Sequence, residues 1–278
     1  MEVRLFFFLA CHFFLLEAPS WDMKKFVLIL LLLPALIFSD DGALKRPVVL
    51  SVPKAGGHLA LKTLSLFPET PKGQWADHIV NCGVRNPLFY DSETPKVIIV
   101  RDLRDVFVSL VYWFDAQIEE GLINRHLAAK RKGLRELIQH WRSCSFDEKL
   151  RIVLEDGQEN LYYDGCMREN IEEACVLCDE KNTQVIRFED LVGPKGGGNL
   201  ESQKECIRQF AAVFSQDLKE KQVEEISQKM FGTAHPTEFD QTFRKGQIGA
   251  WKSHYNEKNL LLFYMRYGRY QKVFGYIQ

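Results

Sequence analysis

A short apolar run that breaks into a glycine-containing loop is the strongest constraint on this fold. Residues 48–52 are mostly β-branched and predict a buried strand. Proline, Lys54, a small residue and two glycines follow, and Leu59 begins a helical leucine pattern. In such a strand–loop–helix turn, N–H groups converge at the positive end of a helix dipole. The segment predicts a site for a phosphate-like or sulfate-like anion. The alternative is an ordinary turn with a solvated lysine.

The loop differs from the magnesium-binding P-loop. In the pattern GxxxxGK[ST] the lysine follows the glycines, whereas Lys54 precedes them, and no Ser or Thr follows to hold the metal. The chain is 46% hydrophobic and 26% charged, with a net charge of −1, as in a globular protein. This balance argues against general nucleic-acid binding, so any anion site must be local.

The N-terminal residues differ from the rest of the chain. A short basic segment after Met23 precedes an apolar run at 26–38 and a small polar exit, the pattern of a signal peptide. We interpret residues 1–42 as a hydrophobic leader that is either a signal peptide or a membrane anchor. Translation would start at Met1 or at Met23. A buried or interfacial helix is the alternative. A working leader predicts a secreted, periplasmic, lumenal or membrane-anchored protein with membrane contact through the leader, and otherwise a cytoplasmic one.

Six cysteines lie beyond the leader, an even number that permits disulfides in an exported chain. Cys175 and Cys178 form a single CxxC without a second pair or histidines at ligand spacing, so we expect no zinc. We expect no other metal, because the 52–56 loop lacks the Ser or Thr ligand that a P-loop offers to magnesium. Cys82 and Cys206 lie in apolar patterns typical of small core residues.

Strands and helices alternate along the rest of the chain. Apolar runs predict strands at 48–52, 78–82, 96–100 and 183–188, and helical patterns fill 133–142, 146–154, 166–178, 201–214, 220–230 and 257–274. This alternation predicts a parallel α/β sheet covered on both faces. Lys54, Arg101 and Glu189 each follow a strand end, where such sheets bind ligands.

Four segments, in order, resemble the sulfotransferases that use 3′-phosphoadenosine-5′-phosphosulfate (PAPS). Residues 51–58 (SVPKAGGH) resemble the family's 5′-phosphosulfate loop, and 101–109 (RDLRDVFVS) resemble its 3′-phosphate motif. Residues 187–191 (RFEDL) resemble its YEDL element. The longest match is 243–254 (FRKGQIGAWKSH), which resembles the C-terminal lid motif.

The resemblance implies a fold and an activity. The expected fold is one α/β domain at 46–278, with a parallel sheet of about five strands flanked by helices, related to nucleotide kinases. The expected activity is transfer of a sulfuryl group from PAPS to a hydroxyl or amine, releasing adenosine 3′,5′-bisphosphate. The acceptor would be a small molecule, a glycan or a peptide, and the protein a monomer or homodimer.

The resemblance also assigns residue roles. Lys54 would contact the oxygen that bridges phosphate and sulfuryl group, and His78 would act as catalytic base. Arg101 and Ser109 would bind the 3′-phosphate. Cofactor binding is assigned to Lys54, Ala55, Gly56, Gly57, His58, Leu59, Arg101, Ser109, Phe188, Phe243, Arg244, Lys245 and Gly246.

Several positions depart from the family pattern. Gly57 and His58 stand in place of two threonines, Phe188 in place of a tyrosine, Leu59 in place of an aromatic residue and Ala250 in place of an aspartate. These departures keep open a catalytically weak or inactive effector module that binds PAPS or its product. A nucleotide kinase on the same architecture is a second alternative, and the absence of GK[ST] argues against it. For Arg101 and its neighbours, helix capping alone is the alternative.

Overall fold

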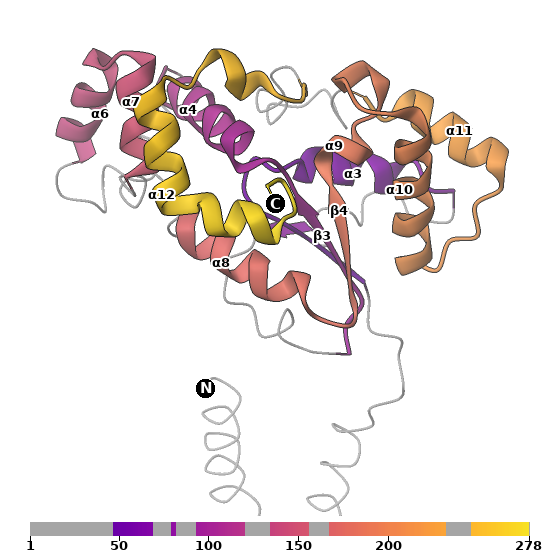
Figure 1. The fold of residues 1–278 in the computed structure, drawn as a ribbon. Helices are drawn as coiled ribbons and strands as arrows, with labels where there is room; N and C mark the ends of the chain where they lie inside the picture. Colours follow the sequence, from indigo (N-terminus) through magenta and orange to yellow (C-terminus); the bar gives the residue numbers. More distant parts are fainter. Residues whose placement is uncertain are drawn as a thin grey trace, which may run out of the picture. The chain divides into compact units, whose positions relative to one another are not determined.

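The protein alternates strands and helices, as the sequence predicts (Figure 1). The structure, a computed structural model, describes residues 47–68, 79–81, 93–119, 134–155, 167–231 and 246–277, with 79–81 and 134–135 described by their backbone alone. The described elements, in chain order, are β1 (Val48–Ser51), α3 (Gly57–Ser65), β2 (Ile79–Asn81), β3 (Lys96–Val100), α4 (Leu103–Glu119), α6 (Leu134–Ser143), α7 (Phe146–Leu154), α8 (Met167–Cys178), β4 (Thr183–Arg187), α9 (Phe188–Leu191), η4 (Pro194–Gly196), α10 (Leu200–Val213), α11 (Glu220–Lys229), η6 (Ala250–Ser253) and α12 (Glu257–Val273).

Four parallel strands form the sheet in the order β2-β1-β3-β4. Leu50 of β1 pairs with Val80 of β2 on one side and with Ile98 of β3 on the other, and Ile98 pairs with Val185 of β4. The predicted parallel α/β sheet is confirmed, and four of the roughly five strands expected for the family lie in the described ranges. Because all four strands run the same way, their carboxyl ends share one edge.

Helices cover both faces of the sheet. On β3, Ile98 and Val100 join one buried cluster with side chains of α4, α7, α8 and α12, whereas Val97 and Ile99 join another with α3, α9, α10 and α11. Side chains of a strand alternate between faces, so a strand buried at every position needs cover on both. Figure 1 shows these two helical layers on either side of β3 and β4.

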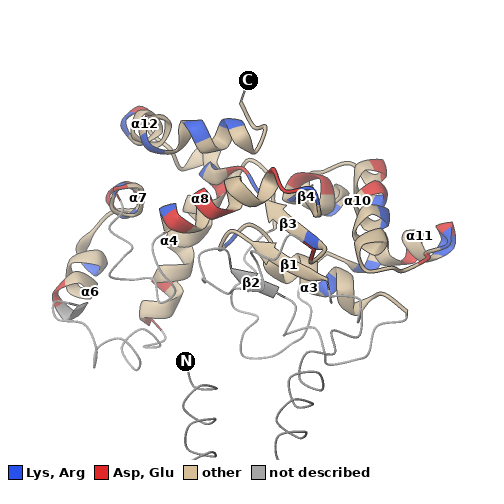
Figure 2. Cartoon of the chain, turned by 90° about the horizontal axis from the view of Figure 1, so that it is seen from below, with Lys and Arg blue, Asp and Glu red and all other residues tan. Residues whose placement is uncertain are grey.

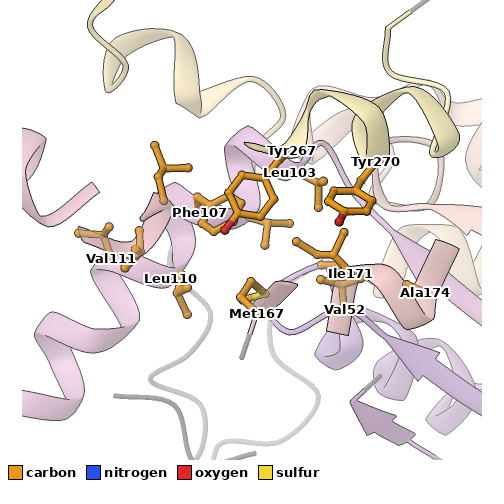
Figure 3. Packing of buried hydrophobic residues seen from close by; sticks show 14 of the residues in the cluster. Val52, Leu103, Phe107, Leu110, Val111, Met167, Ile171, Ala174, Tyr267 and Tyr270 are labelled. Carbon is orange, nitrogen blue, oxygen red and sulfur yellow. The ribbon is translucent and has the colours of Figure 1, made fainter. Parts of the chain in front are cut away.

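Aromatic packing joins the helices of the first layer. The rings of Phe107 on α4 and Tyr267 on α12 lie 4.5 Å apart between centroids. Figure 3 shows this pair beside Leu103, with Met167 and Ile171 of α8 nearby. The packing places α12 against α4, the helix that follows β3.

The predicted helices are confirmed. Those at 133–142, 146–154, 166–178, 201–214, 220–230 and 257–274 correspond to α6, α7, α8, α10, α11 and α12. Local capping explains some of the boundaries. The Ser145 hydroxyl accepts from the N–H of Glu148, whose carboxylate accepts from the N–H of Ser145, and this capping box begins α7. The Asn256 side chain caps α12.

The paired helices α10 and α11 carry charges of both signs (Figure 2). Arg208 of α10 donates to Glu220 of α11 over 2.6 Å, and Lys204 lies 3.3 Å from Glu224. Exposed pairs of this kind contribute little to stability. The exposed charged side chains of α10 and α11 thus form a solvent-facing surface with charges of both signs.

The described cysteines are free thiols. Cys206 is 6% exposed and packs in the core, as predicted, while Cys82 lies outside the described residues. Burial raises the pKa of Cys175 to about 11 and that of Cys178 to about 12. Both therefore stay protonated near neutral pH, which disfavours metal binding and thiol chemistry.

Over the ranges that the structure describes, no helix is both long and apolar enough to cross a membrane. The predicted leader at 1–42 lies outside these ranges and stays a prediction.

Candidate functional site

The three predicted strand-end motifs meet at one edge of the sheet. Ser51 at the end of β1 is in register with Ile99, and Val100 at the end of β3 is in register with Arg187 at the end of β4. The 52–56 loop, Arg101 and α9 therefore emerge side by side. Figure 1 shows α3, which follows the 52–56 loop, next to α9. This is the edge where parallel α/β sheets bind ligands.

Backbone conformation sets the shape of the 52–56 loop. Lys54 has φ 68° and Gly56 has φ 120°, and the N–H of Ala55 closes the turn onto the carbonyl of Val52 over 2.9 Å. A Cβ atom at Gly56 would lie 2.7 Å from the Phe188 ring. Glycine is therefore required at Gly56 by both its conformation and its close approach to Phe188.

The loop leads directly into α3, which begins at Gly57. The first N–H groups of an α-helix have no acceptor within the helix and carry partial positive charge. The His58 side chain is exposed, whereas Leu59 is 8% exposed and packs in the core. Leu59, predicted to bind the cofactor, would therefore offer its backbone and not its side chain.

Lys54 is a half-buried cation next to a second one. Its Nζ atom lies 5.5 Å from the centroid of the Trp113 ring, which projects from α4. Burial, together with the positive charge of Arg101, lowers the pKa of Lys54 to about 7. The protein therefore holds Lys54 in a place where its own charge is unfavourable without an anion.

Arg101 is buried at 9% exposure and held from several sides. Its guanidinium carbon lies 4.2 Å from the centroid of the Phe188 ring. Nη2 donates to the carbonyl of Gln247 over 3.0 Å, and Nη1 reaches the carbonyl of Lys54 over 3.4 Å. Burial lowers the pKa of Arg101, and the carboxylates of Asp105 and Glu189 oppose this. The guanidinium is thus fixed in orientation within a desolvated pocket.

One donor of Arg101 stays unused. Among the described residues, no acceptor reaches its buried Nε. A buried donor without an acceptor costs free energy, on the order of 1–3 kcal/mol. An anion at this place would remove that cost. Among the described residues, this donor is the strongest feature that favours an anionic ligand at this edge of the sheet.

Three further predicted site residues, Ser109, Phe188 and Gly246, lie within the described ranges. Ser109 lies in the second turn of α4 with its side chain half-buried. Phe188 is 4% exposed and supports Arg101 and Gly56, so its ring serves as a platform. Gly246 has φ 58°, and a Cβ atom at Gly196 would lie 2.6 Å from its carbonyl oxygen.

The glycine-rich loop at 193–198 has both exposed and buried residues. Pro194 and Lys195 are exposed, but Gly196 is buried and its carbonyl accepts from the N–H of Ile248 over 3.0 Å. The loop therefore binds the C-terminal motif.

Glu189 orients neighbouring segments. One of its carboxylate oxygens accepts from the N–H of Asp102 over 3.0 Å, and the other accepts from the hydroxyl of Tyr276. Both of these contacts hold protein groups, so Glu189 links α9 to the start of α4 and to the C-terminus.

Asp105 is the residue whose role the sequence analysis missed. It is 1% exposed, and its two oxygens accept from the N–H groups of Gly249 over 2.7 Å and Trp251 over 2.8 Å. Helix capping alone therefore does not account for the charged residues at 101–105. In the sequence, the only hint of this role is that an acidic residue stands four positions after Arg101, at the start of the helix.

Four predicted site residues lie outside the described residues: His78, Phe243, Arg244 and Lys245. Their roles stay predictions. Within the described ranges, no group of three or more His, Cys, Asp or Glu side chains is placed to hold a metal ion.

Comparison with known proteins adds evidence on the fold. No protein-family model matches the chain, and no curated protein matches it. The solved structure of mouse sulfotransferase SULT7A1 complexed with PAP matches with a TM-score of 0.57 and 13% identity, over 84% of this chain and 88% of that chain. Retinol dehydratase in complex with androsterone and inactive cofactor PAP matches with a TM-score of 0.49 and 14% identity, over 82% of this chain and 80% of that chain.

The first of these likenesses covers more than four fifths of each chain, and the described part of this chain holds a parallel sheet between two helical layers. This chain has the α/β fold of the sulfotransferases.

Proposed function

We propose that this protein is a sulfotransferase that moves a sulfuryl group from PAPS to a hydroxyl or amine of an acceptor. The observation that carries the proposal is the buried Nε of Arg101, which has no acceptor among the described residues and lies beside Lys54 and the N-terminus of α3. Two cations and a helix N-terminus at one sheet edge suit a ligand with two separated anionic groups.

Different described residues would bind different groups of the nucleotide. Gly57 and the following N–H groups of α3 would bind the 5′-phosphate, and Lys54 would bind the bridging oxygen. Arg101 would donate to the 3′-phosphate, with the Ser109 hydroxyl as a second donor. When bound, PAPS supplies the sulfuryl group and leaves as adenosine 3′,5′-bisphosphate.

Transfer requires charge stabilisation and a base. A bond forms between the acceptor oxygen or nitrogen and sulfur while the bond from sulfur to the bridging oxygen breaks, as in an in-line displacement. Lys54 would stabilise the charge that develops on that oxygen. His78, assigned from the sequence resemblance, would accept the acceptor's proton.

A second candidate is an effector module that binds the nucleotide with little or no turnover. The observation that favours it lies at the start of α3. Gly57 has no hydroxyl and the His58 side chain is exposed, so the two hydroxyls expected from the family's threonines are missing. Binding would survive their loss better than catalysis.

Two measurements separate these functions. The first is calorimetric binding of adenosine 3′,5′-bisphosphate to the full chain, which both candidates require. The second is turnover of labelled PAPS, with and without a panel of hydroxyl and amine acceptors. Lys54→Ala and His78→Ala should each lower kcat by about 10²–10⁴, and His78→Ala should leave nucleotide affinity nearly unchanged.

Lys62→Ala is the matched control. Lys62 lies on α3, and its ammonium donates to the carbonyl of Phe231 over 3.1 Å, away from the 52–56 loop. It should retain normal turnover. Nucleotide binding without any turnover would select the effector module, and absence of binding would reject both candidates.

A further inference from the structure

A buried carboxylate on α4 holds the C-terminal loop, which we define as residues 246–251. Asp105 accepts the N–H of Gly249 over 2.7 Å and that of Trp251 over 2.8 Å, although these residues lie far apart in the sequence. Gly249 has φ 73°, a left-handed conformation that glycine adopts without strain. The loop is thus tied to the first turn of α4 through its backbone.

The same loop touches Arg101. The carbonyl of Gln247 accepts from Nη2 of Arg101 over 3.0 Å. Gln247 lies two residues before Gly249, so the bonds from Asp105 to the loop restrict where that carbonyl can lie. On the opposite side of the loop, the N–H of Ile248 donates to the carbonyl of Gly196.

Asp105 also lies close to Arg101 but leaves Nε, the donor without an acceptor among the described residues, unbonded. Oδ2 of Asp105 is 3.8 Å from Nη2, beyond the length of a good hydrogen bond. The carboxylate therefore balances part of the guanidinium charge while leaving Nε available. The Phe188 ring supports the guanidinium at 4.2 Å. Arg101 is thus positioned by the loop, by the ring and by a carboxylate that also holds the loop.

We propose that Asp105 is a positioning residue that makes the C-terminal loop part of the receptor for the 3′-phosphate, by fixing the Gln247 carbonyl that orients Arg101. The proposal rests on the proposed function. It predicts that substitution of Asp105 weakens the binding of nucleotides that carry a 3′-phosphate and hardly changes the binding of nucleotides that lack one.

The test compares two ligands on the full chain. Affinities for adenosine 3′,5′-bisphosphate and for adenosine 5′-monophosphate are measured by calorimetry, and their ratio reports the contribution of the 3′-phosphate. Asp105→Asn keeps the size of the side chain but presents an NH₂ group to one of the two N–H donors. We expect the ratio to fall about tenfold, the order of one charge-assisted contact. Hydrogen exchange at Gly249 and Trp251 should accelerate.

Asp115→Asn is the matched control. Asp115 lies on the same helix and also accepts two donors, Trp141 Nε1 over 2.8 Å and Lys149 Nζ over 2.7 Å, but it does not contact the loop. It should lower stability without changing the ratio. A ratio in Asp105→Asn within about twofold of wild type, or an equal loss in Asp115→Asn, overturns the proposal.

Gly249→Ala tests the same link with Asp105 intact, should Asp105→Asn fail to fold. Its Cβ would meet only Lys252, at 3.7 Å, so the change strains the backbone without a clash. We expect a roughly threefold fall in the ratio, and no fall would count against the proposal. A wild-type protein without preference for the bisphosphate would instead refute the proposed function and this inference together.

Discussion

The two loops that meet at Arg101 are built by different means. The 52–56 loop is held by its immediate neighbours, because β1 precedes it, α3 follows it and Ala55 bonds back to Val52. The C-terminal loop at 246–251 is held by Asp105, Arg101 and Gly196, none of which is near it in sequence. The first loop is thus set by local chemistry and the second by assembly of the fold. Arg101 binds one carbonyl from each.

The largest expected effect comes from breaking this shared contact. Arg101→Ala removes the guanidinium that joins both loops and faces the proposed 3′-phosphate. We expect it to weaken binding of adenosine 3′,5′-bisphosphate by about 2–4 kcal/mol, as for loss of a charge-assisted contact in a desolvated site. Binding of adenosine 5′-monophosphate should change much less. Calorimetry with both ligands checks this, and equal losses would contradict the assignment to the 3′-phosphate.

The next effect tests the 52–56 loop at the point where Gly56 packs against Phe188, a residue distant in sequence. Gly56→Ala introduces a Cβ atom 2.7 Å from the Phe188 ring at a backbone φ of 120°. Strain and steric conflict should lower the free energy of unfolding by about 2–3 kcal/mol. Urea denaturation measures this. Gly197→Ala is a control, because Gly197 also has positive φ but open space around its Cβ position. A loss in Gly197→Ala equal to that in Gly56→Ala would show that the Phe188 contact is unimportant.

The pH dependence of nucleotide affinity tests the role of Lys54 in the 52–56 loop. Lys54 has a pKa of about 7 because burial and Arg101 disfavour its charge. A bound anion should raise this pKa, so binding takes up a proton above pH 7. Affinity for adenosine 3′,5′-bisphosphate should therefore be nearly constant just below pH 7 and fall above it, by up to about tenfold per pH unit.

Lys54→Met should flatten this profile, and a wild-type profile that is already flat from pH 7 to 9 would contradict the assignment.

The same lowered pKa of Lys54 makes the stability of the protein depend on pH. The folded state binds fewer protons than the unfolded state between about 7 and the usual 10.5, so the contribution of Lys54 to stability becomes more favourable as pH rises through this window. Lys54→Met should remove that dependence.

The smallest effect concerns how the C-terminal loop is anchored. Trp251 is the largest apolar side chain of this loop, but its indole is only half-buried and packs under the Arg104 guanidinium at 3.8 Å. Trp251→Ala keeps both N–H bonds to Asp105. It should cost about 0.5–1 kcal/mol of stability and leave the preference for the 3′-phosphate unchanged. Thermal unfolding and calorimetry check this, and a large fall in that preference would make the indole the anchor instead.

Much of the fold follows from patterns that are local in sequence. The apolar run of β3 and the 3.6-residue patterns of α10 and α12 predict elements that the structure contains. Lys54 and Arg101 are predicted as site residues by the sequence resemblance and by their places just after strand ends, which parallel strands bring to one edge. His78 remains a prediction from resemblance alone, since it lies outside the described residues.

Contacts between distant residues could not be predicted in this way. By itself, the sequence determined the strands, the helices and the 52–56 loop, because hydrophobic periodicity, glycine and helix capping act over a few residues. Tertiary structure alone decided that Asp105 binds the loop at 249–251 and that Phe188 supports Arg101. It also decided that Gly196 accepts from Ile248. A single sequence does not specify which distant donor a buried acceptor meets, because that pairing is set when the helical layers close on the sheet.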